Sequence, residues 1–155
     1  MANTYTQITM HCIFVVKHRD NLLVKPWRED VHKYISGILQ NLNCMPLAVN
    51  GWMDHVHCIF ALPPTQCVAD VMEVVKTNSS KWINQQGFIP GKFQWQKGYA
   101  AFSMSKSHRD RGIRYVINQE EHHKKRTFKE EYEHLLNYNE VDWDSRYVFE
   151  YYTLE

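Results

Sequence analysis

Two histidines separated by one valine, His55 and His57, have the spacing in this chain that points most directly to chemistry. The apolar run after them, residues 58–62, ends at Pro63-Pro64 and is typical of a buried strand. Successive side chains on a strand point to opposite faces, so both imidazoles are expected on the same face. Because neutral imidazole is the commonest metal ligand in proteins, the pair predicts half of a metal site. The alternative is that one or both histidines are hydrogen-bonded residues that only line the sheet.

A helical pattern later in the chain offers the other half of such a site. Tyr115, Gln119 and His122 fall at positions i, i+4 and i+7, which share one face of a helix. Arg111 and Arg114 add positive charge beside them. A tyrosine next to a metal ion suits attack on a phosphodiester, because the metal neutralises developing charge and a positive field makes the phenol easier to deprotonate. The alternative is that Tyr115 is a packing residue with its hydroxyl in water.

Hydrophobic periodicity and turn residues indicate the elements that must position these side chains. The pattern predicts strands over residues 8–17, 47–51, 55–62 and 99–105, with helices over 26–43, between Pro64 and Gly87, over 107–123 and from the capping box at Thr127 onward. This order, β-α-β-β-α-β followed by helices, predicts an α+β fold of the ferredoxin-like split βαβ type. Such a fold has a central antiparallel sheet with helices on one face, its first and third strands at the centre, and here an additional C-terminal helix that carries Tyr115. The uncovered face would be available for a ligand or another subunit.

Length and composition predict a single domain over residues 1–155. A chain of 155 residues with 44% apolar residues is long enough to bury one core without disulfides. No stretch approaches the roughly 20 apolar residues of a membrane span, and the N-terminus has no signal-like segment, which favours a cytoplasmic protein without membrane contact. The scattered cysteines are expected to be reduced; they are Cys12, Cys44, Cys58 and Cys67.

Charge is distributed unevenly along the chain, although the net charge is only +1. Residues 1–126 contain 16 Lys and Arg against 9 Asp and Glu, a net charge of +7. Residues 127–155 contain 2 against 8, a net charge of −6. A basic body favours a polyanionic ligand such as nucleic acid, whereas a solvated helix surface explains any single basic cluster equally well.

Several motifs together resemble the single-tyrosine HUH transposases of bacterial insertion sequences, of the insertion sequence 200/605 type. His55-Val56-His57 resembles the HUH motif itself, and Tyr115 to Gln119 follows it as YxxxQ. The agreement extends along nearly the whole chain and includes residues 77–82 (TNSSKW), 95–99 (WQKGY), Phe102-Ser103 and 120–123 (EEHH). The HUH motif alone is short, but its combination with YxxxQ at this distance is specific.

The resemblance implies a site in which His55, His57 and Gln119 hold a divalent cation, Mg²⁺ or Mn²⁺. Hard cations prefer oxygen ligands, and this set leaves positions open for phosphate oxygens. Tyr115 would attack single-stranded DNA at a hairpin-marked end and form a 5′-phosphotyrosine with a free 3′-hydroxyl. His122 and Asn118 are candidates for supporting contacts around the ligands. Zn²⁺ is another candidate occupant, but no cysteine evidently completes a zinc set.

The same resemblance implies a homodimer in which the tyrosine helix of one subunit covers the histidines of the other, with residues 107–112 as a hinge. It divides the chain into a body (1–106), a tyrosine helix (107–126) and an acidic C-terminal helix and tail (127–155). DNA binding falls to basic and polar residues, namely Lys17, Arg19, Lys76, Asn78, Ser79 and Lys81, with Arg111 and Arg114 near the tyrosine. Ser79 is equally explained as a small residue in a packed helix. Trp95 is equally explained as a core residue or as a platform on which a base stacks.

Three other interpretations remain open at this level. A domesticated relative would process repeated chromosomal palindromes with the same chemistry. A ferredoxin-like nucleic-acid-binding module would use the histidines only to contact phosphate. A structural zinc domain would need Cys12 or His11 to join His55 and His57.

Overall fold

Two central strands, β1 (Thr9–Val15) and β3 (His55–Ala61), are buried along nearly their whole length and pair in antiparallel register. The edge strands are β2 (Met45–Gly51) and β4 (Ala100–Met104), which gives the strand order β2-β3-β1-β4. This is a computed structural model, and it describes residues 3–144. The order confirms the predicted antiparallel sheet with its first and third strands at the centre.

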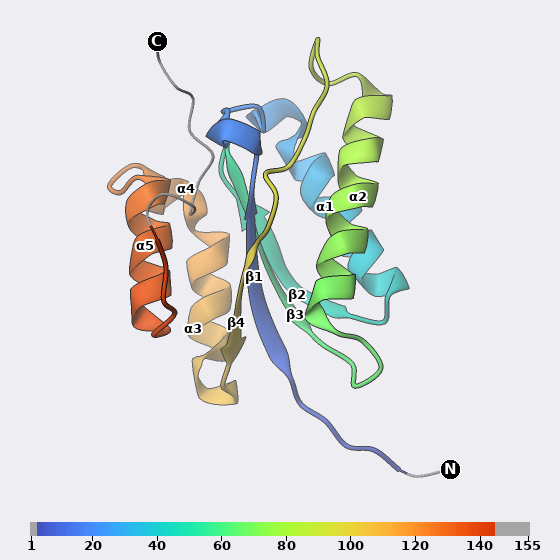
Figure 1. Ribbon diagram of the computed structural model, residues 1–155, viewed down its shortest axis with the longest axis vertical. Coiled ribbons are helices and arrows are strands. Elements are labelled where there is room, and N and C mark those ends of the chain that lie inside the picture. Colours follow the sequence, from blue (N-terminus) through green and yellow to red (C-terminus); the bar gives the residue numbers. More distant parts are fainter. Residues whose placement is uncertain (1–2, 145–155) are drawn as a thin grey trace.

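One face of the sheet is covered by α1 (Lys25–Asn41) and α2 (Val68–Gln86), as Figure 1 shows. Pro26 stands in the first turn of α1, where its missing N–H costs nothing. Gly87 ends α2 in the left-handed conformation, with a φ of 66°. The main core lies between these helices and the inward side chains of the central strands, among them Cys12, Phe14, Val56, Cys58 and Phe60. All four cysteines are free thiols.

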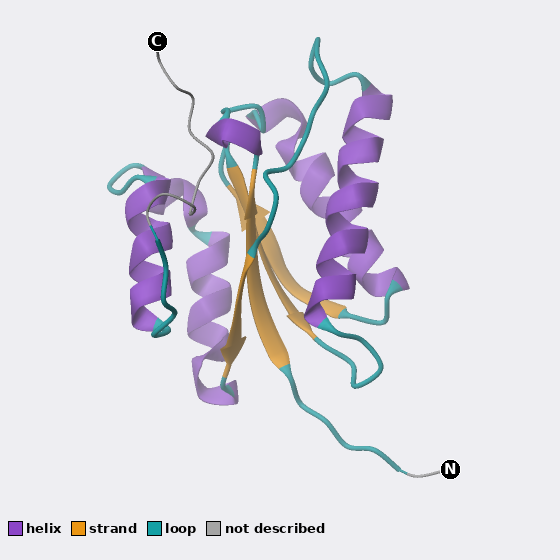
Figure 2. Cartoon of the chain, in the orientation of Figure 1, coloured by secondary structure: helices purple, strands orange, loops and turns teal. Residues whose placement is uncertain are grey.

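The other face of the sheet is covered as well, so the expectation of an open face is wrong for this chain (Figure 2). Its side chains include Ile13 and Ile59, which are apolar and need a cover. Phe128 packs in the cluster with Ile13, and Val116 in the cluster with Ile59. The C-terminal helices on this face are α3 (Lys106–Ile117), α4 (Gln119–His123) and α5 (Phe128–Tyr138), and the two contacts come from α3 and α5.

The helix predicted over 107–123 is interrupted at Asn118, between α3 and α4. The side-chain amide of Asn50 on β2 donates to the carbonyl oxygens of Val116 at 3.1 Å and Ile117 at 2.9 Å. These carbonyls lie at the end of α3, where helix carbonyls need partners from outside the helix. Asn50 therefore ties the C-terminal end of α3 to the edge of the sheet.

Residues 107–112, predicted as a hinge, lie inside α3. A Cβ on Gly112 would come within 2.1 Å of the Cε of Met104, so the glycine allows α3 to approach β4 closely. Thr127 begins α5 as predicted, since its side chain accepts a hydrogen bond from the backbone N–H of Glu130. Residues 145–155 of the acidic segment lie outside the described residues.

Within residues 3–144, no helix is both long enough and apolar enough to cross a membrane.

Candidate metal and tyrosine site

Strand β3 presents His55 and His57 on the face covered by α3 to α5, and both side chains are fully buried. Val56 and Cys58 point to the opposite face and belong to the main core. The two imidazole rings lie edge to face, with centroids 5.0 Å apart. The alternation of a strand thus gives the shared face predicted from the sequence.

Each histidine is oriented by a second residue through its Nδ1 atom. Asp54 Oδ1 lies 2.8 Å from His55 Nδ1, and His11 Nε2 lies 2.8 Å from His57 Nδ1. Burial, with the neighbouring His57, lowers the pKa of His11 to about 3, so His11 is a neutral ring. Both Nε2 atoms are left facing the space beneath the C-terminal helices, an arrangement typical of histidines that ligate metals.

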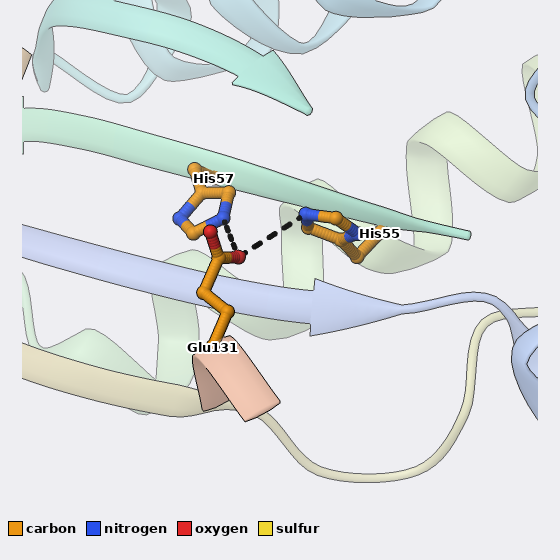
Figure 3. A group of neighbouring side chains, drawn as sticks. All are labelled: His55, His57 and Glu131. Carbon is orange, nitrogen blue, oxygen red and sulfur yellow. Dashed lines mark hydrogen bonds and ion pairs between the residues drawn. The ribbon is translucent and has the colours of Figure 1, made fainter. Parts of the chain in front are cut away.

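Glu131 of α5 brings a carboxylate to these two Nε2 atoms, as Figure 3 shows. Its Oε1 lies 3.0 Å from His57 Nε2 and 3.5 Å from His55 Nε2, and the residue is 1% exposed. The candidate ligand atoms of His55, His57 and Glu131 all lie within 4.8 Å of one another. Among the described residues, these three buried side chains form a group that could hold a metal ion.

Gln119 adds an amide to the same group from the first position of α4. Its Oε1 lies 3.0 Å from His55 Nε2 and 3.2 Å from His123 Nε2. Gln119 is fully buried. The structure therefore brings together His55, His57 and Gln119, the three predicted ligands, and adds Glu131 and His123 to them.

The atoms around His55 Nε2 would suit a cation. Asp54 accepts from Nδ1–H, so a neutral His55 carries its lone pair on Nε2. That lone pair faces two more acceptor oxygens, those of Gln119 and Glu131. Acceptors converging on acceptors in a buried site repel one another unless a positive charge lies between them. A divalent ion would remove this repulsion and use the atoms as its ligands.

Glu131 also contacts Tyr115, because its second oxygen, Oε2, accepts a hydrogen bond from the Tyr115 hydroxyl. One carboxylate thus joins the predicted metal ligands on β3 to the predicted nucleophile on α3. Burial would raise the pKa of Glu131, but hydrogen bonds from His123 and His57 outweigh it and hold that pKa well below its usual range. Glu131 is therefore a carboxylate in this arrangement.

Tyr115 is in a different electrostatic environment from the one predicted. The expectation was that positive charge would make the phenol easier to deprotonate. Instead, burial and then the Glu131 carboxylate raise the pKa of Tyr115 above its ordinary value, while Arg126 opposes the change. His122 packs on the Tyr115 ring with centroids 4.4 Å apart, and His123 is the neighbour that faces the ligands. Asn118 lies exposed at the junction of α3 and α4.

The family described as "Transposase IS200 like" matches residues 4–119, about three quarters of the chain. This chain belongs to the IS200-like transposase family. The match includes both histidines, Tyr115 and Gln119, and it ends before α5. No curated protein matches the sequence at a significant level.

Two solved structures share the fold of this transposase. One, described as a transposase from Deinococcus radiodurans, is 19% identical, with a TM-score of 0.62 over 77% of this chain and 95% of that one. The other is a REP-associated tyrosine transposase bound to a REP hairpin. It is 13% identical, with a TM-score of 0.59 over 79% of this chain and 73% of that one.

The transposase has a basic hollow on α2 and the loop before β4, about 510 Å³ in volume. Its cationic lining residues are Lys17, Lys76, Lys81, Lys92 and Lys97, of which the sequence predicted the first three. Neither Asp nor Glu is among the described residues that line it. Lys76 also donates to the carbonyl oxygens of Gln96 and Gly98, both at 2.7 Å, so it holds this loop against α2.

The remaining predicted DNA-binding residues are placed differently. Ser79 is fully buried and its hydroxyl accepts a hydrogen bond from the Trp95 indole at 2.9 Å, so it is a packing residue rather than a surface contact. Asn78 is exposed on α2, and Arg19 lies in the short 3-10 helix η1 (Lys17–Arg19). Arg111 and Arg114 are both exposed on α3.

Glu131 is the residue of the site that the sequence analysis missed. It occupies the apolar face of α5 between Phe128 and Leu135, at i+3 and i+7 spacing. A carboxylate on the apolar face of an amphipathic helix needs a partner, and that position could have singled it out. Its partners could not have been read from the sequence, because they lie 16 and 74 residues away on other elements.

Proposed function

We propose that this transposase cleaves and rejoins single strands of DNA at hairpin-marked ends, with Tyr115 as the nucleophile. The observation that supports it most is the Glu131 carboxylate, which contacts both the Tyr115 hydroxyl and the paired histidines in one buried group. A tyrosine held beside potential metal ligands is the arrangement that attack on a phosphodiester requires.

In the proposed reaction the Tyr115 oxygen forms a bond to phosphorus, and the bond from phosphorus to the 3′-oxygen breaks. The phenol loses its proton, and the departing 3′-oxygen gains one and becomes a 3′-hydroxyl. The DNA 5′-phosphate remains on Tyr115 as a phosphodiester. A second 3′-hydroxyl can attack this linkage and restore the tyrosine, so cleavage and joining need no external energy source.

The cation would be held by His55, His57, Glu131 and Gln119, with Mg²⁺ or Mn²⁺ as the proposed ion. When bound, it would supply Lewis-acid stabilisation of the charge that develops on the phosphoryl oxygens. Two oxygen ligands, one of them charged, suit these hard cations better than imidazole alone. Two histidines with one glutamate also form a known type of zinc set, so the activity assay should compare the three metals.

DNA would be held by the basic hollow, whose described lining includes five lysines and no Asp or Glu. A solved relative in fold is described as bound to a REP hairpin, which supports hairpin DNA as the substrate here. Genomic context would separate a mobile element from a domesticated relative, since flanking hairpins and multiple copies favour the former. A purely DNA-binding module would give hairpin binding with no covalent product.

We also propose that the protein acts as a homodimer. Each chain would have three functional parts, which are the body at 1–106, the tyrosine helix at 107–126 and the acidic helix and tail at 127–155. The described chain brings Tyr115 to its own histidines through Glu131.

The test is to incubate the protein with labelled single-stranded hairpin DNA and Mn²⁺, then to look for a covalent adduct on a denaturing gel. We expect an adduct with the wild type and none with Tyr115→Phe. Tyr34→Phe is the control and should also form the adduct, because Tyr34 lies on α1, where its ring stacks on Trp82. His57→Ala should abolish the adduct and leave hairpin binding largely intact. An adduct that persists in Tyr115→Phe would refute the mechanism.

A further inference from the structure

A cavity of about 520 Å³ lies beside Tyr115, between α3, α5 and β4, and we refer to it as the α3–α5 cavity. Its volume is in the range of small-ligand sites. Its walls include Phe102 and Ser103 of β4, Arg111 and Tyr115 of α3, and His134 and Tyr138 of α5. Because α5 lies beyond the family match, the family likeness does not account for this wall.

The lining of the α3–α5 cavity selects for a ligand with negative charge and a flat apolar surface. Arg111 and Arg126 supply positive charge, and no Asp or Glu is among the described residues that line the cavity. Phe102 and Tyr138 supply aromatic surface. Tyr138 is 70% exposed, so its ring is accessible to a ligand in the cavity.

Guanidinium groups and aromatic rings together are how proteins hold the phosphate and base of an unpaired nucleotide. The position of the cavity indicates which nucleotide this would be. Tyr115 is itself part of the wall, so an occupant lies next to the nucleophile. A free small molecule has no reason to be held there, whereas a DNA strand that Tyr115 attacks must pass this point.

We propose that the α3–α5 cavity holds one unpaired nucleotide of the DNA strand, adjacent to the phosphodiester that Tyr115 attacks. This inference rests on the proposed function and deepens it, because the cavity then contributes to the choice of the cleavage site. Arg111 and Arg126 contact phosphate, and the base lies against the aromatic surface of Phe102 and Tyr138.

The first experiment measures the rate of adduct formation on substrates that each lack one base near the cleaved phosphodiester. With the wild type, one abasic position should slow the reaction about tenfold, the loss of one base–aromatic contact. Tyr138→Ala should slow the intact substrate similarly and be insensitive to that abasic position, since both changes remove the same contact. Tyr5→Ala, which removes another exposed tyrosine outside the cavity lining, should behave as the wild type.

The second experiment measures binding alone and does not depend on chemistry. Short single-stranded oligodeoxynucleotides with one 2-aminopurine should lose fluorescence on binding to Tyr115→Phe, because the base stacks, and should do so far less with the Tyr115→Phe/Tyr138→Ala double variant. Arg111→Gln should weaken this binding about tenfold, whereas Lys33→Gln on α1 should not.

The outcomes separate the two proposals. Equal rates on every abasic substrate, or equal fluorescence loss with and without Tyr138, would overturn the nucleotide cavity even when Tyr115 forms its adduct. Fluorescence loss that depends on Tyr138, without any adduct in the wild type, would support the cavity and refute the proposed cleavage.

Discussion

At the scale of single residues, Glu131 connects the two halves of the candidate site. Its two carboxylate oxygens face different partners, the histidines of β3 on one side and the Tyr115 hydroxyl on the other. It therefore couples the groups that would hold a cation to the group that would attack DNA. His11 and Asp54 complete the arrangement by fixing the orientation of the two imidazoles.

Glu131→Gln should change both properties. We expect at least a tenfold loss of Mn²⁺ affinity, measured by calorimetry, because a charged oxygen is replaced by a neutral one. The pKa of Tyr115 should fall, because the carboxylate raises it. Alkaline absorbance titration of Glu131→Gln with and without Tyr115→Phe would isolate that tyrosine. Glu133→Gln on the same helix is the control, and equal Mn²⁺ affinity in the two variants would remove Glu131 from the ligand set.

His32 should make stability depend on pH. It is buried on α1, its Nε2 has no hydrogen-bond partner among the described residues, and burial followed by Arg28 lowers its pKa from 6.5 to about 4. The unfolded chain therefore binds a proton more readily than the folded chain between these two values, so stability falls as pH drops through this window. His32→Gln should reduce the loss of unfolding free energy between pH 7 and pH 4.5 by roughly 2 kcal/mol.

Chemical denaturation at the two pH values measures this effect, because any constant cost of the substitution cancels in the difference. His134→Gln, an exposed histidine on α5, should leave the pH dependence unchanged. A wild-type pH dependence retained in full by His32→Gln would contradict the assignment.

At the scale of elements, the position of α3 depends on one side chain of β2. Asn50 donates to the last two carbonyls of α3, and α4 begins immediately afterwards with Gln119. The break at Asn118 thus places Tyr115 and Gln119 on separate helices, although both still reach the same carboxylate. A continuous helix, as predicted, would fix their spacing by helix geometry alone.

Asn50→Ala should lower the free energy of unfolding by about 1 kcal/mol, because two carbonyls at the end of α3, one partly buried and one exposed, lose their hydrogen-bond partner. It should also slow adduct formation, since the end of α3 is no longer tied to the sheet. Thermal or denaturant unfolding and the gel assay measure the two effects. Gln85→Ala, an exposed polar residue on α2, should stay within about 0.5 kcal/mol of the wild type. Normal stability of Asn50→Ala would show that water replaces the amide.

At the scale of the whole molecule, one chain brings Tyr115 together with the candidate metal ligands. Both faces of the sheet are covered, and Phe128 of α5 stacks on His55 with ring centroids 3.8 Å apart. The resemblance predicted that two subunits share their sites. In the described residues, the acidic C-terminal region contributes Glu131 to the group of candidate metal ligands.

A mixture of His57→Ala with Tyr115→Phe distinguishes the two arrangements. We expect no adduct from the mixture, because each chain would lack one half of its own site. Recovery of the adduct would show that the tyrosine of one chain acts on the histidines of another. Co-expression of the two variants with different affinity tags, followed by purification on both tags, ensures that the molecules tested contain both chains.

The sequence by itself determined the features that depend on local geometry. The alternation of a strand places His55 and His57 on one face, periodicity and turn residues indicate the strand order, and helix spacing groups Tyr115 with Gln119. Only the tertiary structure decided that Glu131 joins them, that Ser79 is buried against Trp95, and that the second face of the sheet is covered. These are contacts between segments distant in sequence, which depend on how α3 and α5 pack on the sheet and not on the periodicity of any one element.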